Sequence, residues 1–111
     1  MKPAHLAVEN EDLVLLRELL DSGADIEEID GGDIEEIGGG VTLLQHAIDV
    51  EIDGHTQSGG PLHVDTTAYL LARGADPLAS TPRLGTALDF ARSSGHWLAV
   101  AVIEAHLARR Q

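Results

Sequence analysis

Hydrophobic residues recur at helical spacing in several stretches of the chain. In one stretch the apolar residues fall on a single face of an α-helix, and a glycine follows at position 23; these residues are Leu13, Leu16, Leu19 and Leu20. A second apolar stretch ends before Gly74. Glycine ends helices readily because it adopts the left-handed backbone at no steric cost. The pattern therefore predicts packed helices that stop just before these two glycines.

Three stretches of the sequence align with one another, which indicates an internal repeat. The first is PAHLAVENEDLVLLRELLDSGAD from position 3. The second is split into TLLQHAID from position 42 and VDTTAYLLARGAD from position 64, and the third is TALDFARSSGHWLAVAVIEAHLA from position 86. The repeat predicts six helices in three antiparallel pairs. Residues 1–111 then form one domain, with repeats at about 2–34, 42–78 and 85–111.

The short motifs within these copies carry a family resemblance. PAHLA, TLLQHA and TALDFA stand at the openings, Gly95-His96 stands at a turn, and Gly-Ala-Asp stands at 23–25 and 74–76. Together they resemble the ankyrin repeat, in which a TPLHxA-type opening leads into an inner helix, followed by a Gly-His turn, an outer helix and a Gly-Ala-Asp exit. The resemblance implies an all-α ankyrin-repeat solenoid of three helix-turn-helix repeats with an extended β-hairpin finger. It also implies a module that binds another protein.

The spacing between copies locates two insertions. Ala7 and Ala47 are 40 positions apart, and Ala47 and Ala91 are 44 apart, whereas the family period is about 33. We place the first insertion between the first two copies and the second near 51–62, and we expect the second to be a flexible Gly/Ser loop. Gln45 and Asp89 stand where the family has histidine, so we expect some hydrogen bonds between neighbouring repeats to be missing.

Charge is distributed unevenly along the chain. The net charge is -12, and residues 18–72 contain thirteen acidic residues and no Lys or Arg. Such a one-signed surface repels phosphate backbones and attracts cationic surfaces. We therefore expect a basic protein partner and no direct nucleic-acid binding.

Residues 25–36 hold seven carboxylates, six in two copies of DIEEI that begin at 25 and 33 and one at Asp30 between them. We interpret this acidic segment, the finger, as a hairpin around Asp30-Gly31-Gly32-Asp33 that touches the partner; the alternative is a solvated acidic loop. The inner helices are expected to supply further contacts. The predicted partner-binding residues are Glu27, Glu28, Asp30, Asp33, Glu35 and Glu36 in the finger and Glu9, Asn10 and Asp49 on the inner helices.

No pattern in the sequence favours catalysis, a metal or a cofactor. The stretch from Asp49 matches a calcium-binding loop at its first, fifth and sixth positions and offers Glu51 at the third, but Gly60 replaces the bidentate glutamate needed at the twelfth. The six histidines lack zinc-ligand spacing, and no nucleophile motif or phosphate-binding loop is present. We predict no enzyme activity, no metal site and no cofactor, and we expect Trp97 to lie in the core.

The biological setting is predicted only in outline. The chain contains no cysteine and no apolar run of about 18 residues, so we expect a cytoplasmic protein without membrane contact. Small acidic ankyrin proteins resemble bacterial immunity proteins, which implies an inhibitor that neutralises a basic toxin domain. A regulatory scaffold or adaptor, and an acidic mimic of nucleic acid that occupies a DNA-binding protein, remain alternatives. The oligomeric state stays open.

Overall fold

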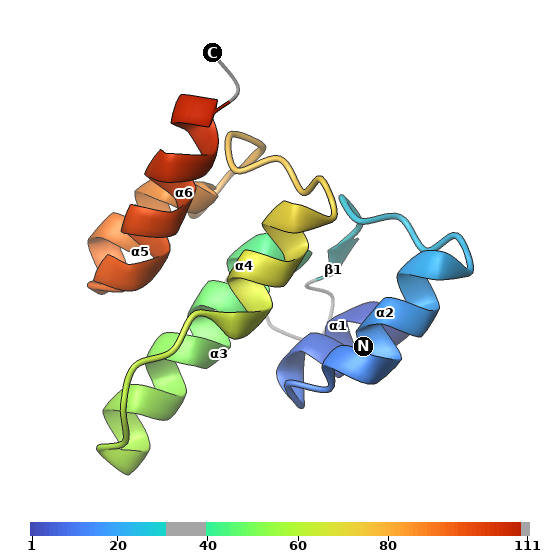
Figure 1. Ribbon diagram of the computed structural model, residues 1–111, viewed down its shortest axis with the longest axis horizontal. Helices are drawn as coiled ribbons and strands as arrows, with labels where there is room; N and C mark the ends of the chain where they lie inside the picture. The colour runs from blue at the N-terminus through green and yellow to red at the C-terminus, as the bar shows by residue number, and fades with distance from the viewer. Residues whose placement is uncertain (31–39, 110–111) are drawn as a thin grey trace.

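The computed structural model describes residues 1–30 and 40–109. Six helices and two short antiparallel sheets of two strands each make up this part of the chain (Figure 1). The helices are α1 Pro3–Glu9, α2 Leu13–Asp21, α3 Leu43–Ser58, α4 Asp65–Ala72, α5 Ala87–Ser94 and α6 Trp97–Arg109. The strands are β1 Ile29–Asp30, paired with β2 Val41–Thr42, and β3 Ser80–Thr81, paired with β4 Gly85–Thr86. The prediction of a mostly helical fold with six helices is confirmed.

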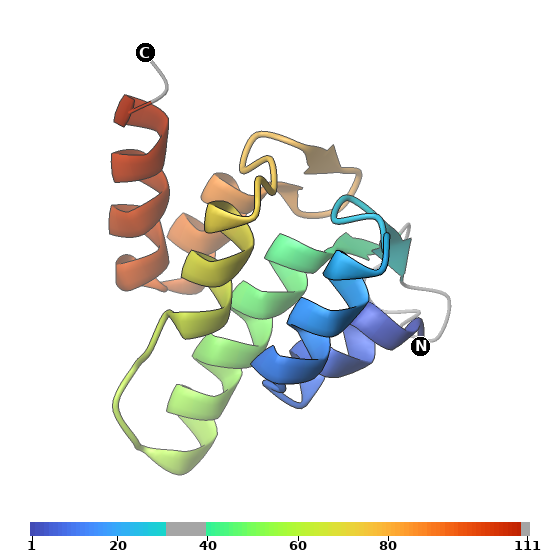
Figure 2. The ribbon, with the colours of Figure 1, turned by 45° about the vertical axis from the view of Figure 1, so that its right-hand side comes forward.

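The helices contact one another in consecutive pairs. α1 packs on α2, α3 on α4 and α5 on α6; in addition α1 packs on α3, and α3 on α5 (Figure 1). Each of the two hairpins leads directly into the first helix of the pair that follows it (Figure 2). No helix in the described residues is long and apolar enough to cross a lipid bilayer.

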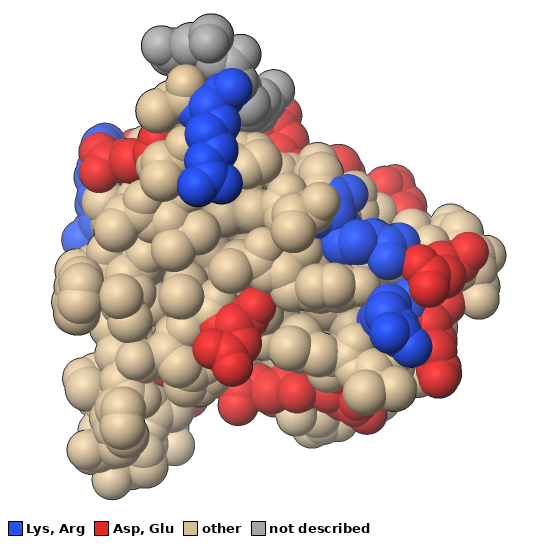
Figure 3. Space-filling view, in the orientation of Figure 1, with Lys and Arg blue, Asp and Glu red and all other residues tan. Residues whose placement is uncertain are grey.

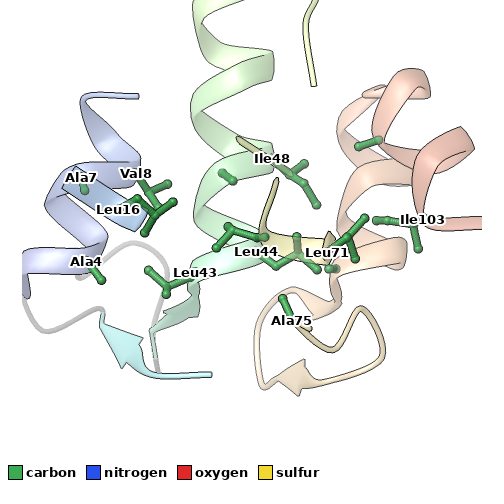
Figure 4. Packing of buried hydrophobic residues seen from close by; sticks show 14 of the residues in the cluster. Ala4, Ala7, Val8, Leu16, Leu43, Leu44, Ile48, Leu71, Ala75 and Ile103 are labelled. Atoms are coloured by element: carbon green, nitrogen blue, oxygen red, sulfur yellow. The ribbon is translucent and has the colours of Figure 1, made fainter. Parts of the chain in front are cut away.

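The core runs from pair to pair as a continuous layer of aliphatic side chains (Figure 4). Ala7, Ala47 and Ala91 are buried at equivalent places in α1, α3 and α5, where a small side chain lets neighbouring helices approach closely. Larger buried residues such as Leu43 and Ile48 fill the space between pairs. Each pair therefore covers the apolar face of the next, and burial of this aliphatic surface is the main source of stability.

Local signals fix the helix ends. Thr42 and Thr86 each form a capping box, in which the threonine hydroxyl accepts from a backbone N–H three residues on and that residue's side chain accepts from the threonine N–H; the partners are Gln45 and Asp89. Lys2 stands at the same place before α1 and makes no such bond. Gly23 and Gly74 have φ of 105° and 99°, as expected for glycines that end helices.

The side chains of His5 in α1 and Gln45 in α3 each connect the first helix of a pair to the hairpin that follows that pair. The His5 Nε2 lies 3.2 Å from the Glu28 carbonyl oxygen, and Gln45 Nε2 donates to the Gly85 carbonyl oxygen at 2.8 Å. We expected this hydrogen bond to be missing because Gln45 replaces a histidine. The glutamine makes it nevertheless, because an amide N–H can donate just as an imidazole N–H does. Within the described part of the chain, the hydrogen bond of the Asp89 side chain is its capping contact with Thr86.

The predicted loop near 51–62 is wrong for most of its length. α3 continues through Ser58, and only residues 59–64 connect it to α4. Asp53 accepts from the Gln57 side chain one turn later, and Gly59, with φ 71°, ends the helix. The insertion therefore lengthens α3 by about two turns instead of forming a Gly/Ser loop.

Two further predictions need correction. The hairpin was expected to turn around Asp30-Gly31-Gly32-Asp33, yet Ile29 pairs with Thr42 and Asp30 with Val41; residues 31–39 lie outside the described residues. Trp97 was expected in the core, but its exposed fraction is 66%. It lies at the start of α6 beside Arg92 and Val100, in a shallow hollow of about 250 Å³.

Candidate functional site

A hollow of about 480 Å³ lies between the end of α1 and the second half of α3. Four carboxylates and two imidazoles stand among its lining residues, and we call it the acidic hollow. These side chains are Glu9, Glu11, Asp49, Asp53, His55 and His63. The described residues that line it include no Lys or Arg. A concave site with this lining favours a cationic group over an anionic one.

The lengthened α3 supplies one wall of the acidic hollow. Asp49 and Asp53 are four residues apart, so they lie on the same face of the helix, one turn from each other. Glu9 is the last residue of α1, and Glu11 lies in the connection to α2. Without the two additional turns of α3, Asp53 would have no helix to hold it opposite Glu11.

The carboxylates of the hollow are crowded. The pKa of Asp49 is raised, first because the surrounding walls limit its hydration and then because the charges of Asp53 and Glu9 lie nearby; His46 opposes this shift. The Asp49 side chain nevertheless stays exposed toward the hollow. A bound cation would relieve the repulsion between these carboxylates, and the site is therefore better suited to holding a positive charge than to standing empty.

Two histidines already contact the hollow's carboxylates. His46 Nε2 lies 2.9 Å from Glu9 Oε2, and His63 Nε2 lies 3.1 Å from Glu11 Oε1. Both glutamates remain about half exposed, at 48% and 40%. These contacts hold the carboxylates in place while leaving their outer faces open to a ligand.

Of the described finger carboxylates, Glu27 and Asp30 accept hydrogen bonds from other parts of the protein. Glu27 Oε2 accepts from the Asp76 backbone N–H at 2.9 Å, and Asp30 accepts from the Lys2 backbone N–H, which lowers the pKa of Asp30. Glu28 is half-buried, and burial raises its pKa. The predicted residues Asp33, Glu35 and Glu36 lie outside the described residues.

The structure divides the predicted partner surface into two acidic groups. It brings Glu9 and Asp49 together in the hollow, whereas Asp30 is tied to Lys2, directly before α1. α1 has seven residues, so the groups are separated by about 10 Å along that helix. Asn10 follows α1 and is exposed, but it does not line the hollow.

Sequence reasoning missed Glu11, Asp53 and His63 as members of the site. Asp53 was visible as the second half of an i, i+4 pair with Asp49, but that signal depends on α3 continuing past position 51. Glu51, considered above as a calcium ligand, is fully buried and faces Thr66, Thr67 and His96. Within residues 1–30 and 40–109 no group of three or more His, Cys, Asp or Glu is placed to hold a metal ion.

Acidic side chains also gather on the surface over α1 and α2. In Figure 3 they run along the lower and right-hand edges, over the first two helices and the segment that follows them. No family model matches the chain, and a search of curated proteins finds no match.

Proposed function

We propose that this chain is an ankyrin-type module that binds a basic protein, with the acidic hollow as the seat for a Lys or Arg side chain of the partner. The observation that carries the proposal is the convergence of Glu9, Glu11, Asp49 and Asp53 on one concave site. Lys and Arg meet such a site with a charged head on a long apolar stem, which suits a hollow that has walls as well as charges.

The arrangement of helices supports the ankyrin-type part of the proposal. Three helix pairs are joined by hairpins, and each first helix packs on the first helix of the next pair. His5 and Gln45 make equivalent links to the following hairpins. Arrays of this kind present long surfaces to partners and place variable residues on them. The hollow uses residues of the insertion, which is the part of α3 that the repeat does not require.

The narrower form of the proposal is an inhibitor that neutralises a basic toxin domain. Small size and a net charge of -12 support it, because electrostatic attraction speeds the encounter with a basic partner. An adaptor would bind a partner without abolishing its activity, and a nucleic-acid mimic would compete with DNA for it. Assaying the captured partner for toxicity and for DNA binding, with and without this chain, separates the three.

Neutralising the hollow is expected to slow association with the partner. The variant Asp49→Asn with Asp53→Asn removes two charges from the hollow, and we expect an association rate about tenfold lower at low salt. The difference is expected to shrink as salt rises, because exposed charges are screened within about 10 Å at 0.1 M. The measurement is the association rate against ionic strength, with a purified partner captured from the native host.

A second variant controls for net charge. Glu18→Gln with Glu104→Gln removes two exposed carboxylates on α2 and α6, away from the hollow. We expect it to associate nearly as fast as the wild type. Equal slowing in both variants would show that the total charge, and not the hollow, attracts the partner. A third variant neutralises Asp33, Glu35 and Glu36 together and tests whether the finger contributes to the association rate.

A further inference from the structure

Two buried histidines from different helix pairs face each other beside the acidic hollow. His5 of α1 and His46 of α3 have exposed fractions of 0% and 4%. Their Nδ1 atoms are 2.9 Å apart, and the rings meet edge to edge, with centroids 5.2 Å apart and planes inclined by 28°. The outer nitrogens have partners too: His5 Nε2 lies 3.2 Å from the Glu28 carbonyl oxygen, and His46 Nε2 lies 2.9 Å from Glu9 Oε2.

A definite number of ring protons is needed for all three contacts to be hydrogen bonds. The Glu28 carbonyl only accepts, so His5 Nε2 carries a proton. The carboxylate of Glu9 only accepts, so His46 Nε2 carries one as well. Between the two Nδ1 atoms one donates and the other accepts, which requires a single proton. All three contacts are hydrogen bonds when the four ring nitrogens hold three protons, and in that state the pair carries one positive charge.

The surroundings place that charge on His46. The pKa of His5 is lowered, chiefly by burial and further by His46 and Lys2; the contact with the Glu28 carbonyl and the charge of Asp30 oppose the shift. His46 lies against the Glu9 carboxylate and near Asp49. His5 is then the neutral ring whose Nδ1 accepts, and His46 is the imidazolium that donates to both His5 and Glu9.

We infer that the His5–His46 pair is a proton-operated latch between α1 and α3, closed with three ring protons and opened by the gain of a fourth or the loss of one. A fourth proton sets two N–H groups against each other across 2.9 Å. With only two protons, one of the three contacts has no donor. Both changes weaken the packing of α1 on α3, and this inference does not depend on the identity of a partner.

The direction in which acid changes the stability of the protein follows from the pKa of His5. The His5 pKa in the folded protein lies below the ordinary value of 6.5, so the unfolded chain takes up this proton first as pH falls. The contribution of His5 to stability is complete above about pH 6.5 and is lost as pH falls toward its folded pKa. The titratable groups that face the pair are Glu9 from α1, Asp49 from α3, and Asp30 and Lys2 from the segments before the helices.

The test is ring ¹⁵N NMR of the wild-type protein from about pH 4 to about pH 9, a range that brackets histidine titration. At intermediate pH we expect His5 protonated only at Nε2, His46 protonated at both nitrogens, and a nuclear Overhauser contact between the rings. That contact is expected to disappear at both ends of the range. A His46 ring with one bare nitrogen while the contact persists would overturn the inference.

The variant Glu9→Gln distinguishes the loss of the ring contact at high pH from its loss at low pH. A glutamine amide either accepts from His46 Nε2–H or donates to a bare Nε2, so the latch no longer needs its third proton. We expect the alkaline loss of the ring contact to vanish in this variant, while the acid loss remains. Glu18→Gln, an exposed carboxylate on α2, is the matched control and is expected to keep both losses. Persistence of the alkaline loss in Glu9→Gln, or its absence in Glu18→Gln, contradicts the latch.

Discussion

Replacing Glu51 with alanine is expected to lower the free energy of unfolding by about 3–5 kcal/mol, because each buried hydrogen-bond donor left without its acceptor costs about 1–3 kcal/mol. Glu51 Oε2 accepts from the backbone N–H groups of Thr66 and Thr67, at 3.0 and 3.1 Å. Its Oε1 accepts from Thr67 Oγ1 at 2.6 Å and lies 2.9 Å from His96 Nε2. Alanine leaves all of these donors buried without an acceptor.

Two companion variants make the Glu51 experiment specific. Glu51→Gln keeps one oxygen in place, so we expect a smaller loss of about 1–3 kcal/mol. Asp53→Ala lies two residues further along α3 but is exposed, and we expect a change within about 0.5 kcal/mol. Urea unfolding followed by circular dichroism measures all three. A loss below about 1 kcal/mol for Glu51→Ala would mean that water replaces the missing carboxylate.

Replacing Gln45 with alanine is expected to cost about 2–4 kcal/mol, since each buried polar group left without a partner costs about 1–3 kcal/mol. Besides its bond to Gly85, the Gln45 side chain accepts from the Thr42 backbone N–H at 3.0 Å and from Thr81 Oγ1 at 3.2 Å. The residue is fully buried. It therefore joins the start of α3 to the hairpin before α5.

The chain supplies its own control for Gln45. Asp89 occupies the equivalent position in α5 but is exposed and only caps its helix. Asp89→Ala should cost about 1 kcal/mol, the usual value for a lost cap. If the two alanine variants were equally destabilised, Gln45 would contribute as a cap alone, and its bonds to the next hairpin would add nothing.

The helix pairs could be predicted from the sequence because their signals are local. Apolar spacing in α2, small alanines at 7, 47 and 91, and the glycines at 23 and 74 all depend on residues close in the chain. The structure confirms these features. Thr42 and Thr86 likewise cap helices three residues away. When local signals agree with the overall fold in this way, the fold can be predicted from a single sequence.

The length of α3 and the acidic hollow could not be predicted because their causes are distant in the chain. Gly54 and the pair Gly59-Gly60 gave the segment a loop-like composition. What keeps it helical includes the burial of Glu51, whose partner His96 is 45 positions away. Tertiary contacts of this kind override local propensity. A prediction that ends α3 two turns early also omits Asp53 and the wall of the hollow opposite Glu11.

The position of Trp97 decides how this protein can be observed. It is the single tryptophan of the chain, and its indole is already 66% exposed in the folded state. Its fluorescence should therefore resemble that of indole in water before unfolding as well as after, and it will follow unfolding poorly. A partner that covers the outer side of α5 and α6 would instead transfer the indole to an apolar environment and shift its emission to shorter wavelength. Intrinsic fluorescence is thus a reporter of contact at the last helix pair, and a blue shift on mixing would place a partner there without any label.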